Sequence, residues 1–223
     1  MDFLDSAKTL LNLKSNTGND MREIYFSVDV ETNGPIPADF SMLSFGAAAY
    51  NDDGTFLDTF ERNLEDLDGA KEDADTMAWW ATQPEAWELC QKNKVNPFDA
   101  MTDFTKWIDD TCERFNGKAV FLAYPAGFDF TFIYWYFMHF TGRCPFSFNS
   151  LDIKSYGMAM LGTPFKETTK RAFPNRWKSK RRHTHEAIED ALGQGELFVA
   201  MLKENKANIE ALKAVREAVS KLR

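Results

Sequence analysis

Residues 26–31 carry the pattern that most restricts how this chain of 223 residues can fold. Apolar and polar side chains alternate along this stretch, and a period of two predicts a β-strand. Successive strand side chains point to opposite faces, so Asp29 and Glu31 share one face. Two neighbouring carboxylates repel each other unless a cation lies between them, and Mg²⁺ or Mn²⁺ prefers such oxygen ligands. The strand alone leaves an alternative equally open, a polar strand face that ends in an Asn-Gly-Pro turn.

The rest of the chain predicts strands and helices in an order that suits a layered α/β fold. Apolar runs bounded by turn residues predict strands, and the first three are consecutive and antiparallel. Strands first, followed by strands mixed with helices, favour a three-layer α/β/α architecture with a mixed central sheet. The expected strands are 26–31, 43–50, 55–64, 119–124 and 150–153, with a hairpin turn at 51–54, and the expected helices are 75–94, 98–115, 130–140, 154–161, 185–202 and 208–222.

The expected boundaries give one main domain with a segment at each end. A chain of this length is long for one domain but does not require two. Residues 1–20 predict a short amphipathic helix at 2–13 and a polar linker, and residues 21–205 form the domain. Residues 206–223 predict a helix that packs on the domain or forms a dimer contact. We therefore expect a monomer or a homodimer.

The cysteines and the apolar runs bear on the cellular environment. Cys90, Cys112 and Cys144 are odd in number and widely spaced, which argues against a disulfide framework or a zinc finger. No apolar run is long enough to span a membrane, and the N-terminus lacks a signal-peptide pattern. We expect a cytoplasmic protein with no membrane partner.

Charge is distributed unevenly along the chain. The formal net charge of −8 would ordinarily argue against a nucleic-acid partner. Residues 166–182 nevertheless hold eight basic residues and one acidic residue, so this basic segment carries +7 and the remainder of the chain carries −15. A local positive stripe on an acidic body is more informative than the total charge.

Two further acidic motifs have both a structural and a functional interpretation. Asp129 follows the strand at 119–124 and opens a buried helix, where a helix N-cap is the favoured interpretation of this residue alone. Taken alone, the segment 185–191 favours an acidic, solvent-exposed first turn of a helix. His185 and Asp190 are five residues apart and would not share a face of one helix. We therefore expect His185 on the loop before the helix and Asp190 in its second turn.

Taken together, the three motifs resemble those of the DEDDh 3′→5′ exonuclease superfamily. This group includes polymerase proofreading subunits, ribonuclease T and oligoribonuclease. The resemblance runs over roughly residues 21–203 and comprises Asp29-Val30-Glu31-Thr32-Asn33-Gly34, Tyr124-Pro125-Ala126-Gly127-Phe128-Asp129, and the His-x-Ala-x-x-Asp-Ala pattern from His185 to Ala191. It implies a ribonuclease-H-like fold. Residues 75–80 also resemble a segment of small bacterial and phage members.

The resemblance implies a catalytic role for five residues. Asp29, Glu31 and Asp190 would hold one divalent cation, Mg²⁺ or Mn²⁺, and Asp29 with Asp129 would hold a second. Two cations can clamp the attacking and leaving oxygens of an in-line displacement at phosphorus. His185 would take the proton of the attacking water, because an imidazole of pKa about 6.5 titrates in the useful range. One departure is Tyr124-Pro125, where the family often has His-Asn, and it puts the support of the site in doubt.

The resemblance and the composition also suggest substrate contacts. Leu43 lies where family members wedge a side chain against the terminal base, and the backbone near Thr32 and Asn33 lies where the terminal 3′-hydroxyl is bound. Aromatic candidates for stacking on bases are Phe45, Trp79 and Trp80, although core packing is favoured for each ring singly. The basic segment would track the phosphates through Arg176, Lys178, Lys180 and Arg181, with Phe173 and Trp177 as further stacking rings.

The resulting expectation is a two-metal 3′→5′ exonuclease that acts on single-stranded ends and releases nucleoside 5′-monophosphates. RNA is slightly favoured over DNA as the substrate. The alternatives are a DNA-directed exonuclease for proofreading or DNA-end processing, and a catalytically silent nucleic-acid-binding module on the same fold. The presence of all five site residues weighs against the silent module.

Overall fold

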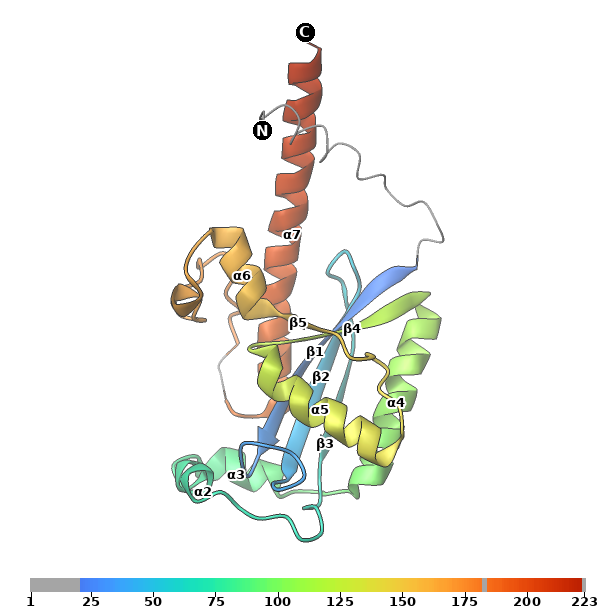
Figure 1. The fold of residues 1–223 in the computed structure, drawn as a ribbon, viewed down its shortest axis with the longest axis vertical. Helices are drawn as coiled ribbons and strands as arrows, with labels where there is room; N and C mark the ends of the chain where they lie inside the picture. Colours follow the sequence, from blue (N-terminus) through green and yellow to red (C-terminus); the bar gives the residue numbers. More distant parts are fainter. Residues whose placement is uncertain (1–20, 182–183, 222–223) are drawn as a thin grey trace, which may run out of the picture.

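The alternating stretch at residues 26–31 lies inside β1 (Arg22–Thr32), the middle strand of a five-stranded sheet in the computed structural model (Figure 1). The structure describes residues 21–181 and 184–221. The strand order is β3-β2-β1-β4-β5; β1 pairs antiparallel with β2 and parallel with β4, which confirms the mixed sheet. The other strands are β2 (Met42–Tyr50), β3 (Phe56–Asn63), β4 (Gly117–Ala123) and β5 (Ser150–Asp152).

Helices cover both faces of this sheet, so the predicted three-layer architecture is confirmed (Figure 1). One face is covered by α4 (Pro97–Arg114) and α5 (Ala126–Phe140), and the other by α6 (Ile153–Leu161) and α7 (Ala187–Ser220). The helical region expected at 75–94 is two short helices, α2 (Ala74–Trp80) and α3 (Pro84–Cys90). Pro84 disfavours helical backbone at the residue before it, which explains the break. The 3₁₀ turn η1 (Phe165–Glu167) begins the basic segment.

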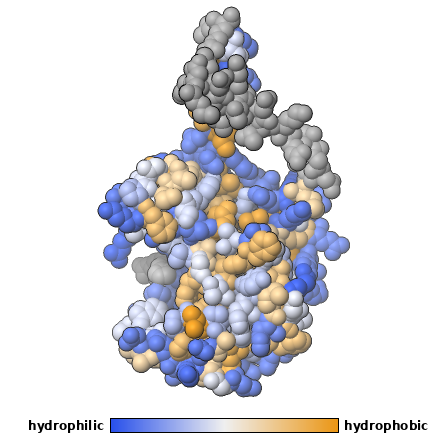
Figure 2. Space-filling view, in the orientation of Figure 1, coloured by the Kyte–Doolittle hydropathy of each residue, from blue (hydrophilic) through white to orange (hydrophobic). Residues whose placement is uncertain are grey.

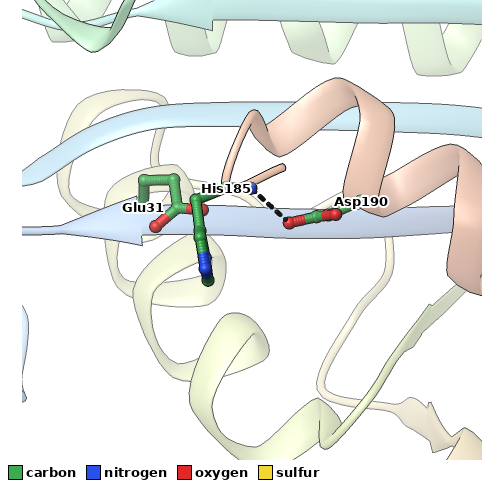
Figure 3. Close-up of side chains that lie close together, drawn as sticks. All are labelled: Glu31, His185 and Asp190. Atoms are coloured by element: carbon green, nitrogen blue, oxygen red, sulfur yellow. Dashed lines mark hydrogen bonds between the residues drawn. The ribbon is translucent and has the colours of Figure 1, made fainter. Parts of the chain in front are cut away.

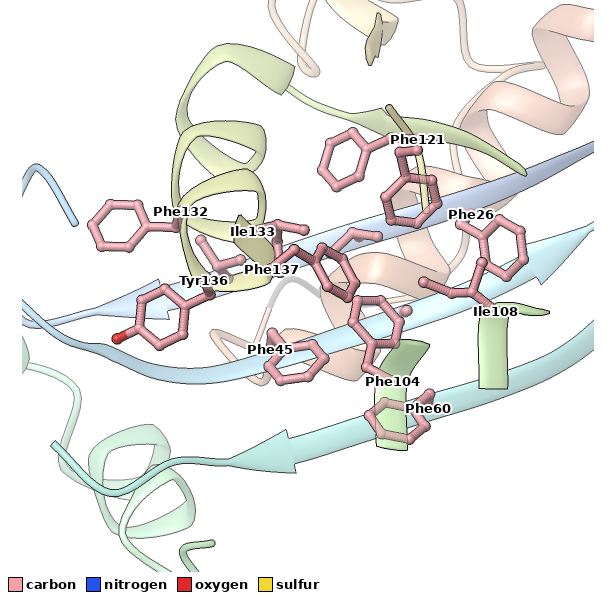
Figure 4. Packing of buried hydrophobic residues seen from close by; sticks show 14 of the residues in the cluster. Phe26, Phe45, Phe60, Phe104, Ile108, Phe121, Phe132, Ile133, Tyr136 and Phe137 are labelled. Atoms are coloured by element: carbon pink, nitrogen blue, oxygen red, sulfur yellow. The ribbon is translucent and has the colours of Figure 1, made fainter. Parts of the chain in front are cut away.

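The two faces of β1 have different surroundings. Phe26, Val28 and Val30 point into an aromatic layer beneath α4 and α5, which Figure 4 shows filled by rings such as Phe104 and Phe137. The odd-numbered residues point toward α7, where Tyr25 packs in a second, smaller core. The large aromatic core lets the opposite face of the same strand carry acidic side chains, because burial of apolar area supplies most of the stability.

The last helix is longer than expected. Residues 185–202 and 208–222 were predicted as two helices, but α7 runs unbroken from Ala187 to Ser220. The connection at residues 203–207 contains no proline or glycine and therefore nothing that ends a helix. From residue 207 to residue 220 the helix is exposed and projects from the body, whereas Lys206 Nζ still donates to the carbonyl oxygen of Asp52 (Figure 1). A dimer contact through this segment stays a prediction.

The remaining expectations concern the ends, the thiols and the surface. The helix predicted at 2–13 lies outside the described residues. Cys90, Cys112 and Cys144 are free thiols, as expected. None of the described helices combines the length and apolar character needed to cross a membrane. The face in Figure 2 shows hydrophobic surface over α5 and its surroundings, where Phe128, Met138 and Phe148 are exposed, within a hydrophilic rim.

A glycine sets how closely α7 approaches the sheet. Gly46 on β2 lies opposite Asp29 in the β1–β2 register. A Cβ atom at Gly46 would lie 2.4 Å from both the Cα and the backbone nitrogen of Ile188, in the first turn of α7. Backbone atoms cannot yield as the end of a flexible side chain can. Gly46 therefore allows the first turn of α7 to lie directly on the sheet beside Asp29.

We predict that Gly46→Ala pushes the first turn of α7 away from the sheet. Overpacking of this kind costs about 1–3 kcal/mol of the free energy of unfolding, which denaturant unfolding measures. Gly193→Ala on the same helix is the matched control, because a Cβ there meets only Arg181 Cβ at 3.9 Å. The control should leave stability unchanged or raise it. Equal stability of Gly46→Ala and Gly193→Ala would contradict the close approach.

Candidate active site

The predicted acidic residues meet where β1 ends and α7 begins. Asp29 and Glu31 project from β1 toward α7, and Glu31 is only 9% exposed. Ligand atoms of Glu31, His185 and Asp190 all lie within 4.8 Å of one another. Figure 3 shows the Glu31 side chain beside that of His185, with the Asp190 carboxylate directed at the His185 backbone. Segments about 150 residues apart in the sequence thus form one acidic cluster.

Asp129 joins this cluster from the first turn of α5. Its Oδ1 accepts a hydrogen bond from the backbone N–H of Val30 at 3.1 Å. Val30 lies between Asp29 and Glu31 in the sequence, so this bond ties Asp129 to the acidic pair. The N-cap position of α5 is Pro125, so the simple N-cap interpretation of Asp129 is wrong. Because β4 is parallel to β1, both strands end at the same edge of the sheet and bring Asp129 to the acidic pair.

His185 lies on the loop before α7, as expected, in an unusual backbone conformation. Its φ of 58° is in the left-handed region, which costs a non-glycine residue roughly 1–2 kcal/mol. The N–H groups of Thr184 and His185 donate to the Asp190 carboxylate at 3.3 and 3.1 Å and hold the loop in this shape. Asp190 is in the first turn of α7, one turn earlier than predicted.

The imidazole of His185 also has a fixed neighbour. The ring of Trp79 meets it edge to face, with centroids 4.9 Å apart and an interplanar angle of 85°. Trp79 projects from α2 and is 38% exposed. Of the rings predicted to stack on bases, Trp79 is therefore at the site and partly open to solvent.

The acidic cluster is electrostatically strained. Burial raises the pKa of Asp29 well above its ordinary range, and the surrounding carboxylates, Asp129 first, raise it further. Burial and the charges of Asp190 and Asp129 raise the pKa of Glu31 to about 8. Burial raises the pKa of Asp129 to about 7, although the Val30 N–H bond lowers it. Among the described residues, the groups around Asp29, Glu31 and Asp129 therefore offset only part of their negative charge.

This donor set fits hard divalent cations. Four carboxylates converge, and Mg²⁺ and Mn²⁺ favour carboxylate oxygen. A cation between them would offset the repulsion that helps to raise the pKa values of Asp29 and Glu31. The described residues thus offer both the ligands and the uncompensated charge that a metal site requires.

Two hydrogen bonds that sequence reasoning missed fasten α7 to β1 beside Asp29. Gln194 is 2% exposed, and its Nε2 donates to the carbonyl oxygen of Val28 at 2.7 Å. Ser27 Oγ donates to the carbonyl oxygen of Ala191 at 2.7 Å. Gln194 lies one helical turn after Asp190 and therefore on the same face of the helix. A polar residue at this spacing was the sequence signal that could have indicated its place beside the site.

Three predicted substrate contacts are buried instead. Leu43 and Phe45 are each 1% exposed and Trp80 is 2% exposed. Phe45 packs with Phe60 and Phe104 in the aromatic core, whereas Trp80 packs near Leu43 and donates its indole N–H to the carbonyl oxygen of Thr32. Stacking by Phe45 and Trp80 is therefore corrected to core packing. The wedge expected at Leu43 does not fit this conformation, because a wedge needs an exposed side chain.

Thr32 and Asn33 are largely engaged within the protein. Thr32 Oγ1 donates to the carbonyl oxygen of Gly34, and Asn33 Oδ1 accepts from the N–H of Ser41 at 2.6 Å. The backbone N–H of Asn33 donates to Ser41 as well. These bonds hold the chain after β1 rigid beside the acidic cluster. A 3′-hydroxyl contact there stays a prediction.

The basic segment is fastened to α7. Arg176 donates two hydrogen bonds to Glu204, at 2.6 and 2.8 Å, and Arg181 pairs with Glu189 and Glu196. Lys178 donates to the carbonyl oxygen of Arg171 and Lys180 is exposed. Phe173 and Trp177 are each 2% exposed and belong to the core beneath the segment, so their predicted stacking on bases is corrected to packing. Phosphate contacts through the four cations stay a prediction.

Comparisons with known sequences identify similar proteins. The family described as the 3′-5′ exoribonuclease Rv2179c-like domain matches residues 25–202. The chain is also 33% identical over 178 residues to the 3′-5′ DNA exonuclease Cap18 of Escherichia coli, which covers 79% of this chain and 90% of Cap18. The family match spans all three motifs of the acidic cluster.

Comparisons with solved structures show the fold. The nuclease domain of 3′hExo, a DEDDh family member bound to rAMP, matches with a TM-score of 0.65 at 11% identity, over 84% of this chain and 95% of that one. The Mg²⁺- and Mn²⁺-bound form of S. pombe Pop2p matches with a TM-score of 0.54 at 13% identity, over 78% of this chain and 81% of that one. The predicted ribonuclease-H-like fold is confirmed.

We predict that the metal-free protein loses stability as the pH rises. Because folding raises the pKa of Glu31 to about 8 and that of Asp129 to about 7, the folded state binds more protons than the unfolded state between about pH 4 and pH 8. The melting temperature in chelator should therefore fall across this range, and Mg²⁺ should restore it.

Asp29→Asn removes one of the repelling charges at nearly constant size. It should raise the melting temperature in chelator at pH 8, flatten the pH dependence and lower nuclease activity by several orders of magnitude. Asp68→Asn, at an exposed loop position, is the matched control and should change neither quantity. A chelator-treated wild type that grows more stable toward pH 8 would contradict the electrostatic account.

Proposed function

The chain belongs to the family of Rv2179c-like 3′-5′ exoribonuclease domains, and from this premise we propose that it removes nucleotides from single-stranded 3′ ends with two divalent cations. Membership makes it a 3′→5′ exonuclease of the DEDDh type, as its motifs predicted. The observation that carries the proposal is the convergence of Asp29, Glu31, Asp129 and Asp190 with His185 at one edge of the sheet. The products are nucleoside 5′-monophosphates and a strand shortened by one residue.

The four carboxylates divide between two cation positions. Asp29, Glu31 and Asp190 would hold one cation, and Asp29 with Asp129 would hold the other. When bound, the cations supply Lewis-acid stabilisation of charge on the attacking and leaving oxygens. The raised pKa values of Asp29, Glu31 and Asp129 support cation binding at this cluster, because the described residues offset its negative charge only in part.

His185 is the general base of the proposed reaction. A water molecule attacks the terminal phosphorus, its proton passes to the imidazole, and the bond from phosphorus to the 3′-oxygen of the preceding nucleotide breaks. The left-handed loop and the Trp79 ring restrict where the imidazole can lie. Its nearness to Glu31 and Asp190 supports a base on the side of the attacking water.

RNA is slightly favoured as the substrate, because the family is described as one of exoribonucleases. DNA is the second candidate, since the 33% identical relative is named as a DNA exonuclease. The two candidates are separated by digesting 5′-labelled single-stranded RNA and DNA of one sequence side by side with Mg²⁺, Mn²⁺ or chelator. The proposal expects a ladder shortened from the 3′ end in metal and none in chelator. Activity that persists in chelator, or products that arise from internal cleavage, would contradict it.

We predict that His185→Ala lowers kcat by about 10²–10⁴-fold at saturating metal. The wild-type rate should rise with pH through a limb that the variant lacks, because the base must be deprotonated. His139→Ala, whose ring stacks on Trp135 near the end of α5, is the matched control. If His185→Ala instead weakens metal binding and keeps the rate at saturating metal, His185 is a ligand and not the base.

We also predict that the basic segment binds phosphates upstream of the scissile bond. Replacing Lys178 and Lys180 by Gln should raise KM with little change in kcat, and it should lower the slope of log K against log salt by about 0.7 per lost contact. Replacing Arg176 and Arg181 should have a further effect on stability, because both arginines also pair with α7. If both double variants keep the wild-type KM and the wild-type salt slope, the segment is a solvated surface that does not bind the substrate.

A further inference from the structure

Lys170 lies in a turn of the basic segment. Residues just before and just after this turn are buried in the protein core. Two residues earlier, Thr168 is fully buried, and its carbonyl oxygen accepts a hydrogen bond from the Tyr124 hydroxyl at 2.5 Å. Three residues later, Phe173 is 2% exposed and packs against the ring of Tyr124. The backbone of Lys170 is therefore fixed, although the segment around it is irregular.

The Lys170 side chain lies over Tyr124 and borders a cavity that it shares with Asp190 of the acidic cluster. Its Nζ lies 5.1 Å from the centre of the Tyr124 ring. Tyr124 directly follows β4, and the chain then enters the first turn of α5, which contains Asp129. The cavity measures about 280 Å³ and lies between the basic segment and α7. Asp190 and Gln194 line the same cavity from α7, so the cavity reaches the metal-binding carboxylates. Gln194 Oε1, also buried there, has no hydrogen-bond partner among the described residues.

The electrostatic effects of Lys170 and the position of His185 distinguish two sides of the cluster. The ammonium of Lys170 acts on Asp29 and Asp129, where it lowers both pKa values against the larger effect of burial. His185 groups instead with Glu31 and Asp190. An in-line displacement has the attacking and leaving oxygens on opposite sides of phosphorus. Asp190 lines the Lys170 cavity as well, but Glu31 does not, so Lys170 and His185 approach the cluster from different directions. If His185 serves the attacking water, Lys170 can serve the leaving oxygen.

Lys170 differs from the arginines of the same segment in what its charge faces. Arg176 and Arg181 pair with carboxylates of α7 that lie outside the acidic cluster. The Lys170 ammonium lies over an aromatic face and toward the cluster, a contact worth roughly 0.5–1 kcal/mol at partly exposed sites. This placement leaves its N–H groups suited to an anionic oxygen brought in by the substrate.

We propose that Lys170 is a further catalytic residue, which donates hydrogen bonds to the scissile phosphate and to the 3′-oxygen that leaves. The inference rests on the proposed function. As the bond from phosphorus to the 3′-oxygen breaks, its electron pair passes to that oxygen, and the Lys170 ammonium stabilises the resulting negative charge. The oxygen then takes a proton from solvent water, while the proton of the attacking water goes to His185. Tyr124 is a positioning residue that holds the Lys170 turn through Thr168.

The test compares two leaving groups on one strand. One oligonucleotide has an ordinary terminal phosphodiester, and the other has sulfur in place of the bridging 3′-oxygen. A thiolate leaves with less stabilisation than an alkoxide does. Both strands carry the sugar type that the wild type degrades faster, and both are digested in saturating Mn²⁺.

Lys170→Met should lower kcat by about 10²-fold on the oxygen substrate and by much less on the sulfur substrate. Lys170→Arg should recover part of the loss, and Tyr124→Phe should show a smaller loss with the same preference for sulfur. Lys118→Met makes the same charge change at an exposed position at the start of β4 and should leave both rates unchanged. The melting temperatures of all the variants should match that of the wild type.

Other outcomes would overturn the inference. Equal losses on the two substrates would mean a structural or metal-holding role, and a rise in KM at constant kcat would mean that Lys170 only binds upstream phosphates. If Lys170→Met does not fold, equal losses on both substrates for Tyr124→Phe and Lys170→Arg would overturn it. A wild-type protein that is inactive on both substrates would refute the proposed function itself. An active wild type together with an equally active Lys170→Met variant would refute only the role of Lys170.

Discussion

Repulsion among buried carboxylates is the constraint on which the rest of this structure depends. Burial raises the pKa values of Asp29, Glu31 and Asp129, and neighbouring carboxylates raise those of Asp29 and Glu31 further. Such a cluster would push its elements apart unless they were held from outside. The aromatic layer beneath α4 and α5 provides much of that support, and the Gln194 and Ser27 bonds close the opposite side. Repulsion stored in this way favours the binding of cations, which offset it.

Much of the fold followed from periodicity in the sequence. The alternation at residues 26–31 predicted β1, and the consecutive apolar runs predicted the antiparallel β1–β3 group. The predicted helix boundaries were wrong where the local residue pattern did not indicate where a helix ends. The single helix α7 was divided because its apolar stripe is interrupted, although nothing in residues 203–207 stops a helix. Conversely, the break before Pro84 was overlooked inside one helical pattern.

The site was predictable in its charged residues and much less so in its surroundings. The family resemblance singled out the acids and His185, and the structure brings them together in one cluster; their catalytic roles stay a proposal. Burial decided the aromatic residues, and sequence could not assign Phe45 and Trp80 to the core because rings serve packing and stacking equally well. Lys170 was hidden for another reason: eight basic residues lie between positions 166 and 182, and only the tertiary fold shows which of them faces the carboxylates.

The central claim is that these carboxylates form one two-cation site. The most direct test is the location of anomalous scattering in crystals grown with Mn²⁺ and a nucleoside 5′-monophosphate. The account predicts two peaks, one within coordination distance of Asp29, Glu31 and Asp190, and the other near Asp29 and Asp129. The 5′-phosphate should lie across both peaks, with an oxygen near Lys170. Peaks elsewhere, or a single peak that leaves Asp29 without a metal contact, would contradict it.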